Sequence, residues 1–235
     1  MSGQSGLGAD DDAEGATGAA PLGRREAGKA ERRRRIIHAA RDLIRETGNA
    51  GLSMRALAAR AGVSLATPYN LFGSKRAIVL AVLDDVRVYQ DRSAHLTSTD
   101  PLERLFAAVD MAIEFYVDDP QFYKTLWAAV FDASDDVRSE IYNQARNEFW
   151  RHLVEATVEA GAIAEGVDVE LLFKLLDRCF GAAMLEWVVG ELSPDLLAPT
   201  IRHSYALVLK GAASAGWRDA LDARLQESQA RILRG

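Results

Sequence analysis

The stretch Ser53–Lys75, SMRALAARAGVSLATPYNLFGSK, decides the fold of the first part of this 235-residue chain. Within it Leu57, Ala58 and Ala61 recur at helical spacing, and Gly62 follows them directly. This spacing predicts a helix of about two turns, which Ser53 can cap and which a left-handed glycine can end at little cost. Two short helices joined by such a turn are typical of a helix-turn-helix that reads DNA.

The second helix of this stretch is expected to begin at Ser64, whose hydroxyl can accept a hydrogen bond from a backbone N–H one turn on. Pro68, Leu71 and Phe72 are expected to face inward, because they are its large apolar residues at helical spacing. The other residues of this helix are then left largely on the outer face: Leu65, Ala66, Thr67, Tyr69 and Asn70. Small and short polar side chains on that face suit a major groove about 12 Å wide.

Each residue of that outer face has a candidate role in DNA recognition. Thr67 and Asn70 can donate to or accept from base edges, and Leu65 and Ala66 can contact a thymine methyl group. Tyr69 can donate its hydroxyl to a phosphate oxygen. The alternative for any one of these residues is the surface of a small solvated helix.

Ser74, Lys75 and Arg76 open a third expected helix. Ser74 is a suitable cap, but two cations at the positive end of a helix dipole are unfavourable. A bound phosphate would reverse that sign, because free backbone N–H groups and both cations would then face one anion. Lys75 is therefore expected to contact a phosphate, the alternative being two solvated charges.

A basic run, Arg32–Arg35, precedes the helix-turn-helix. It can lie along the DNA backbone or in a minor groove, or it can be a solvated helix face. A membrane-binding patch is less favoured, because the apolar residues behind the run are needed for the core. The candidate DNA-contacting residues are Arg35, Ser53, Arg55, Ser64, Leu65, Ala66, Thr67, Tyr69, Asn70 and Lys75.

The segment GVSLATPYNLFGSKRAIVLAVL resembles the recognition region of the TetR/AcrR family of transcriptional repressors, and the resemblance covers roughly residues 30–85. The helix expected over Ile36–Gly48 also fits the opening of that family. One departure is Pro68, where the family usually has Leu or Ile; proline removes a backbone N–H and predicts a tight or irregular helix start. The residues that meet the family pattern are Gly62, Val63, Ser64, Thr67, Tyr69, Phe72 and Lys75.

Charge divides the chain into three parts. Residues 1–23 carry four acids and no Lys or Arg, and they are expected to form a disordered acidic tail. Residues 24–92 carry 15 basic and seven acidic side chains, a net charge of +8. Residues 93–235 carry −10, which gives −6 for the whole chain. This asymmetry favours a DNA-binding domain attached to an acidic second domain.

The remainder predicts helices only, so the expected fold class is all-α: an N-terminal three-helix helix-turn-helix domain plus a C-terminal helical bundle. The helix-turn-helix domain covers 24–92 and includes a connecting helix, Ser74 to about Asp91. The ligand-binding and dimerisation domain covers 100–235, and the boundary is expected at His95–Asp100. Helix starts are marked by Asp100-Pro101, Asp119-Pro120, Ser193-Pro194, Ser134 and Asp168.

The C-terminal part is rich in aromatic residues, which are suited to lining a pocket for an apolar or aromatic ligand. Plain core packing is the alternative for each of them. The family resemblance implies that a small effector binds in this domain. The candidate effector-binding residues are Phe106, Tyr116, Tyr123, Trp127, Tyr142, Phe149, Trp150, Phe173 and Phe180.

Two segments, Val169–Val189 and Leu196–Ala213, are apolar on more than one face, which predicts that they bury a second surface. In the resembled family the corresponding helices form a four-helix interface between two copies, so a homodimer is expected. A deeply buried monomer core is the alternative. Trp217–Leu233 is expected to add a short helix.

Nothing in the sequence favours an enzyme, a metal site or a cofactor. Cys179 is alone on an apolar helix, as expected in a reducing cytoplasm, and the histidines show no metal-ligand spacing. No signal peptide or membrane span is expected. The sequence predicts a repressor that reads a near-palindromic operator in double-stranded DNA as a dimer and is released by a small lipophilic or aromatic effector. A ligand-independent dimeric co-regulator or architectural protein is the alternative.

Overall fold

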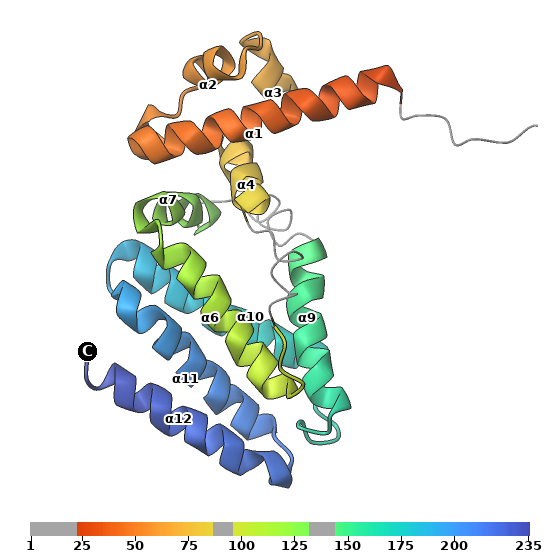
Figure 1. The fold of residues 1–235 in the computed structure, drawn as a ribbon, viewed down its shortest axis with the longest axis vertical. Coiled ribbons are helices and arrows are strands. Elements are labelled where there is room, and N and C mark those ends of the chain that lie inside the picture. The colour runs from red at the N-terminus through yellow and green to blue at the C-terminus, as the bar shows by residue number, and fades with distance from the viewer. Residues whose placement is uncertain (1–22, 87–95, 132–143) are drawn as a thin grey trace, which may run out of the picture.

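The computed structural model describes residues 23–86, 96–131 and 144–235, and these residues are almost entirely helical, as predicted (Figure 1). The N-terminal helices are α1 (Arg24–Gly51), α2 (Met54–Ala61), α3 (Ala66–Phe72) and α4 (Lys75–Val86). The C-terminal helices are α6 (Pro101–Val117), α7 (Pro120–Phe131), α9 (Gln144–Glu159), α10 (Val169–Val189), α11 (Pro194–Ala212) and, after the 3₁₀ turn Ala215–Trp217, α12 (Arg218–Ile232).

Helix α1 is the longest element and organises the N-terminal domain. It contacts both α2 and α4, and its buried apolar face lies at Ile36, Ala40 and Ile44. The basic run Arg32–Arg35 belongs to this same helix and is exposed. At Gly48 the backbone leaves the helical conformation, with φ 64°, so α1 is interrupted near the predicted end of the first helix.

Most of the predicted capping residues do cap their helices. Ser53, Ser74, Asp100 and Asp168 each accept a hydrogen bond from a backbone N–H of the helix that follows, at 2.8 to 3.1 Å. Ser193 precedes α11, but its side chain makes no capping bond. Ser134, a predicted cap, and His95, the start of the expected domain boundary, lie outside the described residues.

The predicted cap at Ser64 is wrong in detail. The position before α3 is taken by Leu65, and the Ser64 hydroxyl instead pairs with the Thr67 hydroxyl at 2.8 Å. The reason is that the Thr67 N–H is already donated to the main-chain carbonyl of Ser64 at 3.0 Å. That bond spans three residues and tightens the start of α3, in agreement with the irregularity expected from Pro68.

The C-terminal domain is a helical bundle in which α10 contacts α7, α9 and α11, while α6 contacts α9 and α11. The predicted C-terminal helix, α12, packs along α11 (Figure 1). Helix α7 lies beneath α1 and contacts α1, α4 and α10. It therefore connects the N-terminal helices with the bundle. Among the described residues, no helix is long and apolar enough to cross a membrane.

Candidate DNA-binding and effector sites

The turn between α2 and α3 depends on glycine for two separate reasons. Gly62 has φ 62° and ψ 43°, the left-handed conformation that ends α2, and the next N–H, from Val63, donates to the Ala58 carbonyl at 3.0 Å. A Cβ atom at Gly62 would also lie 2.7 Å from Nη2 of Arg35. The turn is thus fixed by backbone conformation and by the close approach of a side chain.

Two arginines of α1 contact the helix-turn-helix from within the protein. Arg35 donates to the carbonyls of Ala61 and, at 3.0 Å, Gly62, where the negative end of the α2 dipole favours a cation. Arg33 donates to the Leu71 carbonyl at 3.4 Å, and its guanidinium lies 4.3 Å from the centroid of the Phe72 ring. Sequence reasoning placed Arg35 on DNA; the structure gives it partners in the turn, and the DNA contact remains a prediction.

Helix α3 presents the outer face that the sequence predicted. Pro68 is buried, while Leu65 and Tyr69 are 49% and 51% exposed. Ala66 and Asn70 are exposed and Thr67 is half-buried. Pro68 is the third residue of α3, where a backbone N–H has no intrahelical acceptor, so the proline is tolerated there.

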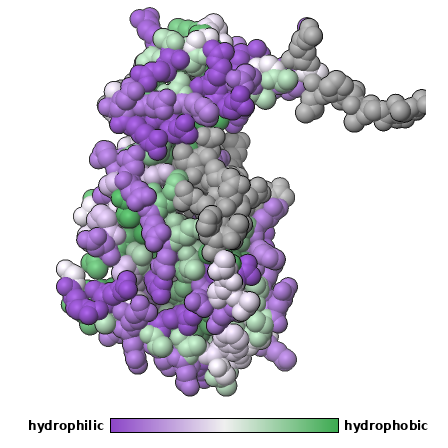
Figure 2. Space-filling view, viewed as in Figure 1, coloured by the Kyte–Doolittle hydropathy of each residue, from purple (hydrophilic) through white to green (hydrophobic). Residues whose placement is uncertain are grey.

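The remaining candidates surround this face. Ser64, Ser53 and Arg55 are exposed, the last two at the start of α2, and Lys75 is half-buried at the start of α4. The face of the N-terminal domain that is visible in Figure 2 is strongly hydrophilic along α1. The arrangement places short side chains at the protruding helix and cations on the elements beside it, as a DNA-binding surface requires.

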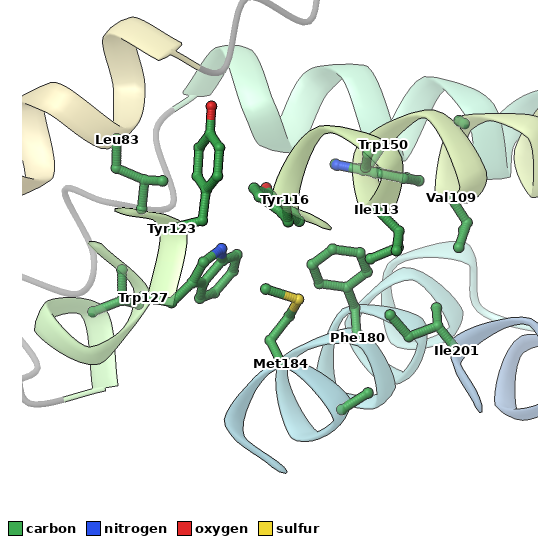
Figure 3. Packing of buried hydrophobic residues seen from close by; sticks show 14 of the residues in the cluster. Leu83, Val109, Ile113, Tyr116, Tyr123, Trp127, Trp150, Phe180, Met184 and Ile201 are labelled. Carbon is green, nitrogen blue, oxygen red and sulfur yellow. The ribbon is translucent and has the colours of Figure 1, made fainter. Parts of the chain in front are cut away.

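The candidate effector residues form a run of ring contacts through the bundle (Figure 3). Tyr116 contacts Tyr123 and Trp127, with ring centroids 5.3 and 5.8 Å apart. Trp127 lies 6.1 Å from Phe180, which lies 6.0 Å from Trp150. Phe149 extends the run, 5.4 Å from Trp150. These rings come from α6, α7, α9 and α10 and pack against one another in the interior of the bundle.

Two of the predicted effector residues, Phe173 and Phe106, stand outside this run. Phe173 and Trp150 line the same small gap. The guanidinium of Arg151 lies 5.2 Å from the centroid of the Phe173 ring. Phe106 lies apart, between the guanidinium groups of Arg202 and Arg224 at 5.6 and 5.3 Å. Its neighbours line a separate open cleft of about 370 Å³ against α12. Tyr142 lies outside the described residues.

Sequence reasoning missed a buried ion pair in the bundle. Arg146 of α9 is only 4% exposed and donates to Asp177 of α10 at 2.6 Å and to Asn147 at 3.2 Å. A signal existed, because Arg146 lies one helical turn before Trp150 and so shares its buried face. Charged residues on helices are mostly solvated, so the sequence alone does not single out Arg146.

Cys179 is the one cysteine of the chain and is half-buried in α10. Burial raises the pKa of its thiol, which therefore stays protonated and weakly nucleophilic near neutral pH. Within the described residues, no group of three or more His, Cys, Asp or Glu side chains is arranged to hold a metal ion.

The chain is similar in sequence to known transcriptional regulators. Residues 36–82 match the model of "Bacterial regulatory proteins, tetR family". The activator FasR of Mycolicibacterium smegmatis is 33% identical over 114 residues, which cover 47% of this chain and 52% of FasR, about half its length. The repressor KstR2 of Rhodococcus jostii is 28% identical over 201 residues, covering 80% of this chain and 94% of KstR2.

Solved structures show the same fold. RolR in complex with resorcinol has a TM-score of 0.64 at 17% identity, covering 86% of this chain and 96% of RolR. Thermus thermophilus FadR in complex with lauroyl-CoA has a TM-score of 0.63 at 19% identity, covering 76% of this chain and 94% of FadR.

A helix-turn-helix with an exposed second helix, carried on an all-helical bundle, defines the class of protein: a DNA-binding transcriptional regulator. Residues 36–82, which include this helix-turn-helix, match the TetR family of these regulators. The curated relatives FasR and KstR2 are both transcriptional regulators.

Proposed function

We propose that the chain is a repressor that binds a near-palindromic operator as a homodimer and is released by a small apolar or aromatic effector. The observation that carries this proposal is the exposed outer face of α3, with Leu65 and Tyr69 about half exposed around the buried Pro68. The proposed DNA-binding domain spans 24–92, after an acidic tail at 1–23, and the proposed effector and dimerisation domain spans 100–235.

In this proposal the residues of α3 and of its two flanks divide into two groups. Thr67 and Asn70 hydrogen-bond to base edges, and Leu65 and Ala66 contact thymine methyl groups. Tyr69 and Lys75 bind phosphates and fix the register of the helix on the duplex. Arg35, Ser53, Arg55 and Ser64 complete the phosphate contacts.

The proposed dimer uses an exposed apolar stripe on α10. Leu171, Leu175, Leu185 and Val189 are 43 to 64% exposed and recur at helical spacing, and Leu207 of α11 is 54% exposed. Helix α12 is held to α11 by residues that do not belong to this stripe: the ion pair Lys210–Asp222 and the contact of His203 with Ser228. Pairing the stripe with its copy gives an isologous four-helix interface that presents two α3 helices to half-sites about 34–36 Å apart or a multiple of that distance.

The effector part of the proposal rests on the ring-lined bundle and on ligand complexes of proteins with the same fold. FadR was solved with lauroyl-CoA and RolR with resorcinol, one ligand with a long apolar chain and one aromatic. An effector that enters between α6, α7, α9 and α10 displaces rings of α7, which contacts α1 and α4. It releases DNA only to the extent that it binds the released state more tightly.

Selection of bound sequences from a random DNA pool tests the helix-turn-helix and the dimer together. A near-palindromic motif is expected, with half-sites separated by about one helical turn or a multiple. A single unpaired motif would contradict the dimer, and no enrichment would contradict sequence reading. A reporter gene placed behind the selected site then separates repression from activation.

The alternative is a ligand-independent dimeric regulator. Thermal unfolding in the presence of lipophilic and aromatic compounds distinguishes it from the effector-released repressor. A bound effector raises the melting temperature by mass action and lowers affinity for the selected DNA. If no compound in a broad panel does either, the ligand-independent regulator is favoured.

A further inference from the structure

The Arg146–Asp177 pair places a charged side chain in the interior of the bundle. Arg146 is 4% exposed, whereas the Asp177 side chain is 22% exposed and reaches the edge of the bundle. The pair borders a gap of about 10 Å³ lined also by Leu105, Trp150 and Phe173. This is room for about one water molecule. A guanidinium thus faces a small space whose other walls are mostly apolar or aromatic.

Burial of this pair is not explained by stability. Removing two charges from water costs more than a well-placed ion pair commonly returns, and apolar replacements are often neutral or stabilising. Ligand sites, by contrast, combine apolar walls with a few convergent polar groups that fix orientation. A planar arginine fork is suited to holding a carboxylate.

We propose that Arg146 is the anchor for an acidic effector: a molecule with an apolar or aromatic body and one carboxylate, which takes the place of Asp177 on the guanidinium. This inference rests on the proposed function, since it names the chemical class of the effector. The body occupies the space between Trp150, Phe173 and the adjoining rings of the bundle.

The exchange keeps the buried charge balanced. Arg146 has a carboxylate partner before and after binding, and Asp177, already partly exposed, turns toward solvent. Because one ion pair replaces another, the apolar body supplies most of the affinity. Arg146 supplies selectivity, since a neutral analogue cannot compensate a guanidinium that loses Asp177.

The exchange predicts opposite effects for the two partners. Asp177→Asn removes the carboxylate that competes with the effector for Arg146. Its affinity for an acidic probe is therefore expected to rise about tenfold or more. Arg146→Gln removes the anchor, so affinity for the same probe is expected to fall by a similar factor. The double variant Arg146→Gln/Asp177→Asn removes both members of the pair and controls for loss of fold.

The probes are matched pairs: decanoate against decanamide, and phenylacetate against phenylacetamide. Binding of each is measured by calorimetry and thermal shift on the full chain, wild type and the three variants. The expected result is that acids bind better than amides to wild type, best to Asp177→Asn, and no better than amides to Arg146→Gln and the double variant. Equal binding of acid and amide to Asp177→Asn, or undiminished acid binding to Arg146→Gln, overturns the proposal.

Affinity for DNA selected from a random pool is measured on the same proteins. Intact DNA binding together with no preference for acids refutes the Arg146 anchor alone. Loss of sequence-specific DNA binding in the folded wild type refutes the proposed function itself.

Discussion

The guanidinium of Arg45, on α1, lies 4.7 Å from the centroid of the Phe122 ring, on α7, and the same side chain donates to Asp119 at 3.2 Å. Asp119 in turn accepts from the Phe122 N–H at 3.4 Å at the start of α7. Because α7 also carries Tyr123 and Trp127 into the ring-lined bundle, this contact joins the DNA-binding helices to the proposed effector site.

Arg45→Met tests that coupling, since methionine keeps an apolar stem over Phe122 but loses the bond to Asp119. DNA affinity without effector is expected to stay close to wild type, while the loss of affinity caused by effector shrinks several-fold. The measurement is DNA binding with and without a saturating effector. Arg218→Met, an exposed change at the far end of the bundle, is the control; an unchanged effector response in Arg45→Met contradicts the link.

Lys75→Gln and Tyr69→Phe are expected to weaken binding to all DNA sequences, because both residues are assigned to phosphates. For Lys75→Gln the slope of log affinity against log salt falls by about one, whereas Tyr69→Phe leaves that slope unchanged. Fluorescence anisotropy at several salt concentrations measures both. If either variant binds DNA with wild-type affinity, the substituted residue does not contact the DNA.

Asn70→Ala is expected to act differently, costing about 1–3 kcal/mol on the preferred site and relaxing preference at one base position in each half-site. Competition among single-base variants of the selected operator measures the change in base preference at each position. A uniform loss across all variants would reassign Asn70 to the backbone.

Gly62→Ala is expected to destabilise the N-terminal domain by about 1–3 kcal/mol, because alanine is strained at φ 62° and its Cβ crowds Arg35. Gly28→Ala is the matched control within α1, where a Cβ would meet only the end of the Arg32 side chain at 3.4 Å. That change favours the helix. Thermal unfolding of both variants gives opposite shifts if the turn depends on glycine.

The Glu46–Arg60 pair gives stability a defined dependence on pH. Two hydrogen bonds from Arg60, at 2.8 and 2.7 Å, hold the pKa of Glu46 below 4.5 in the folded protein. Since the folded pKa is lowered, the stabilisation is present above pH 4.5 and is lost as pH falls through the folded value. Wild type and Glu46→Gln are expected to differ slightly in melting temperature near neutral pH and to converge in acid; a gap that persists in acid argues against the ion pair.

The local parts of the fold were predictable from sequence. The turn at Gly62 and the caps at Ser53, Ser74, Asp100 and Asp168 depend on residues within one helical turn of each other. The cap at Ser64 failed because a main-chain bond from Thr67 took the N–H that the hydroxyl needed.

The tertiary pairings were not predictable in the same way. Helical periodicity shows which side chains face inward, but it does not show which of them meet. Phe106 and Phe180 both belong to inward faces, yet one lies between two arginines and the other in the run of rings. Arg146 and Asp177 are 31 residues apart, and only their packing on neighbouring helices reveals a pair.

The closed bundle has a consequence for how the proposed regulator responds to dose. The gap beside Arg146 has room for only about one water molecule, so an effector that binds there needs a state in which the surrounding side chains have moved apart. The measured affinity is then the intrinsic affinity reduced by the fraction that is open. Side chains that merely loosen or tighten the rings therefore set the concentration at which genes are released. Sensitivity to the inducer can be retuned by residues that never touch it.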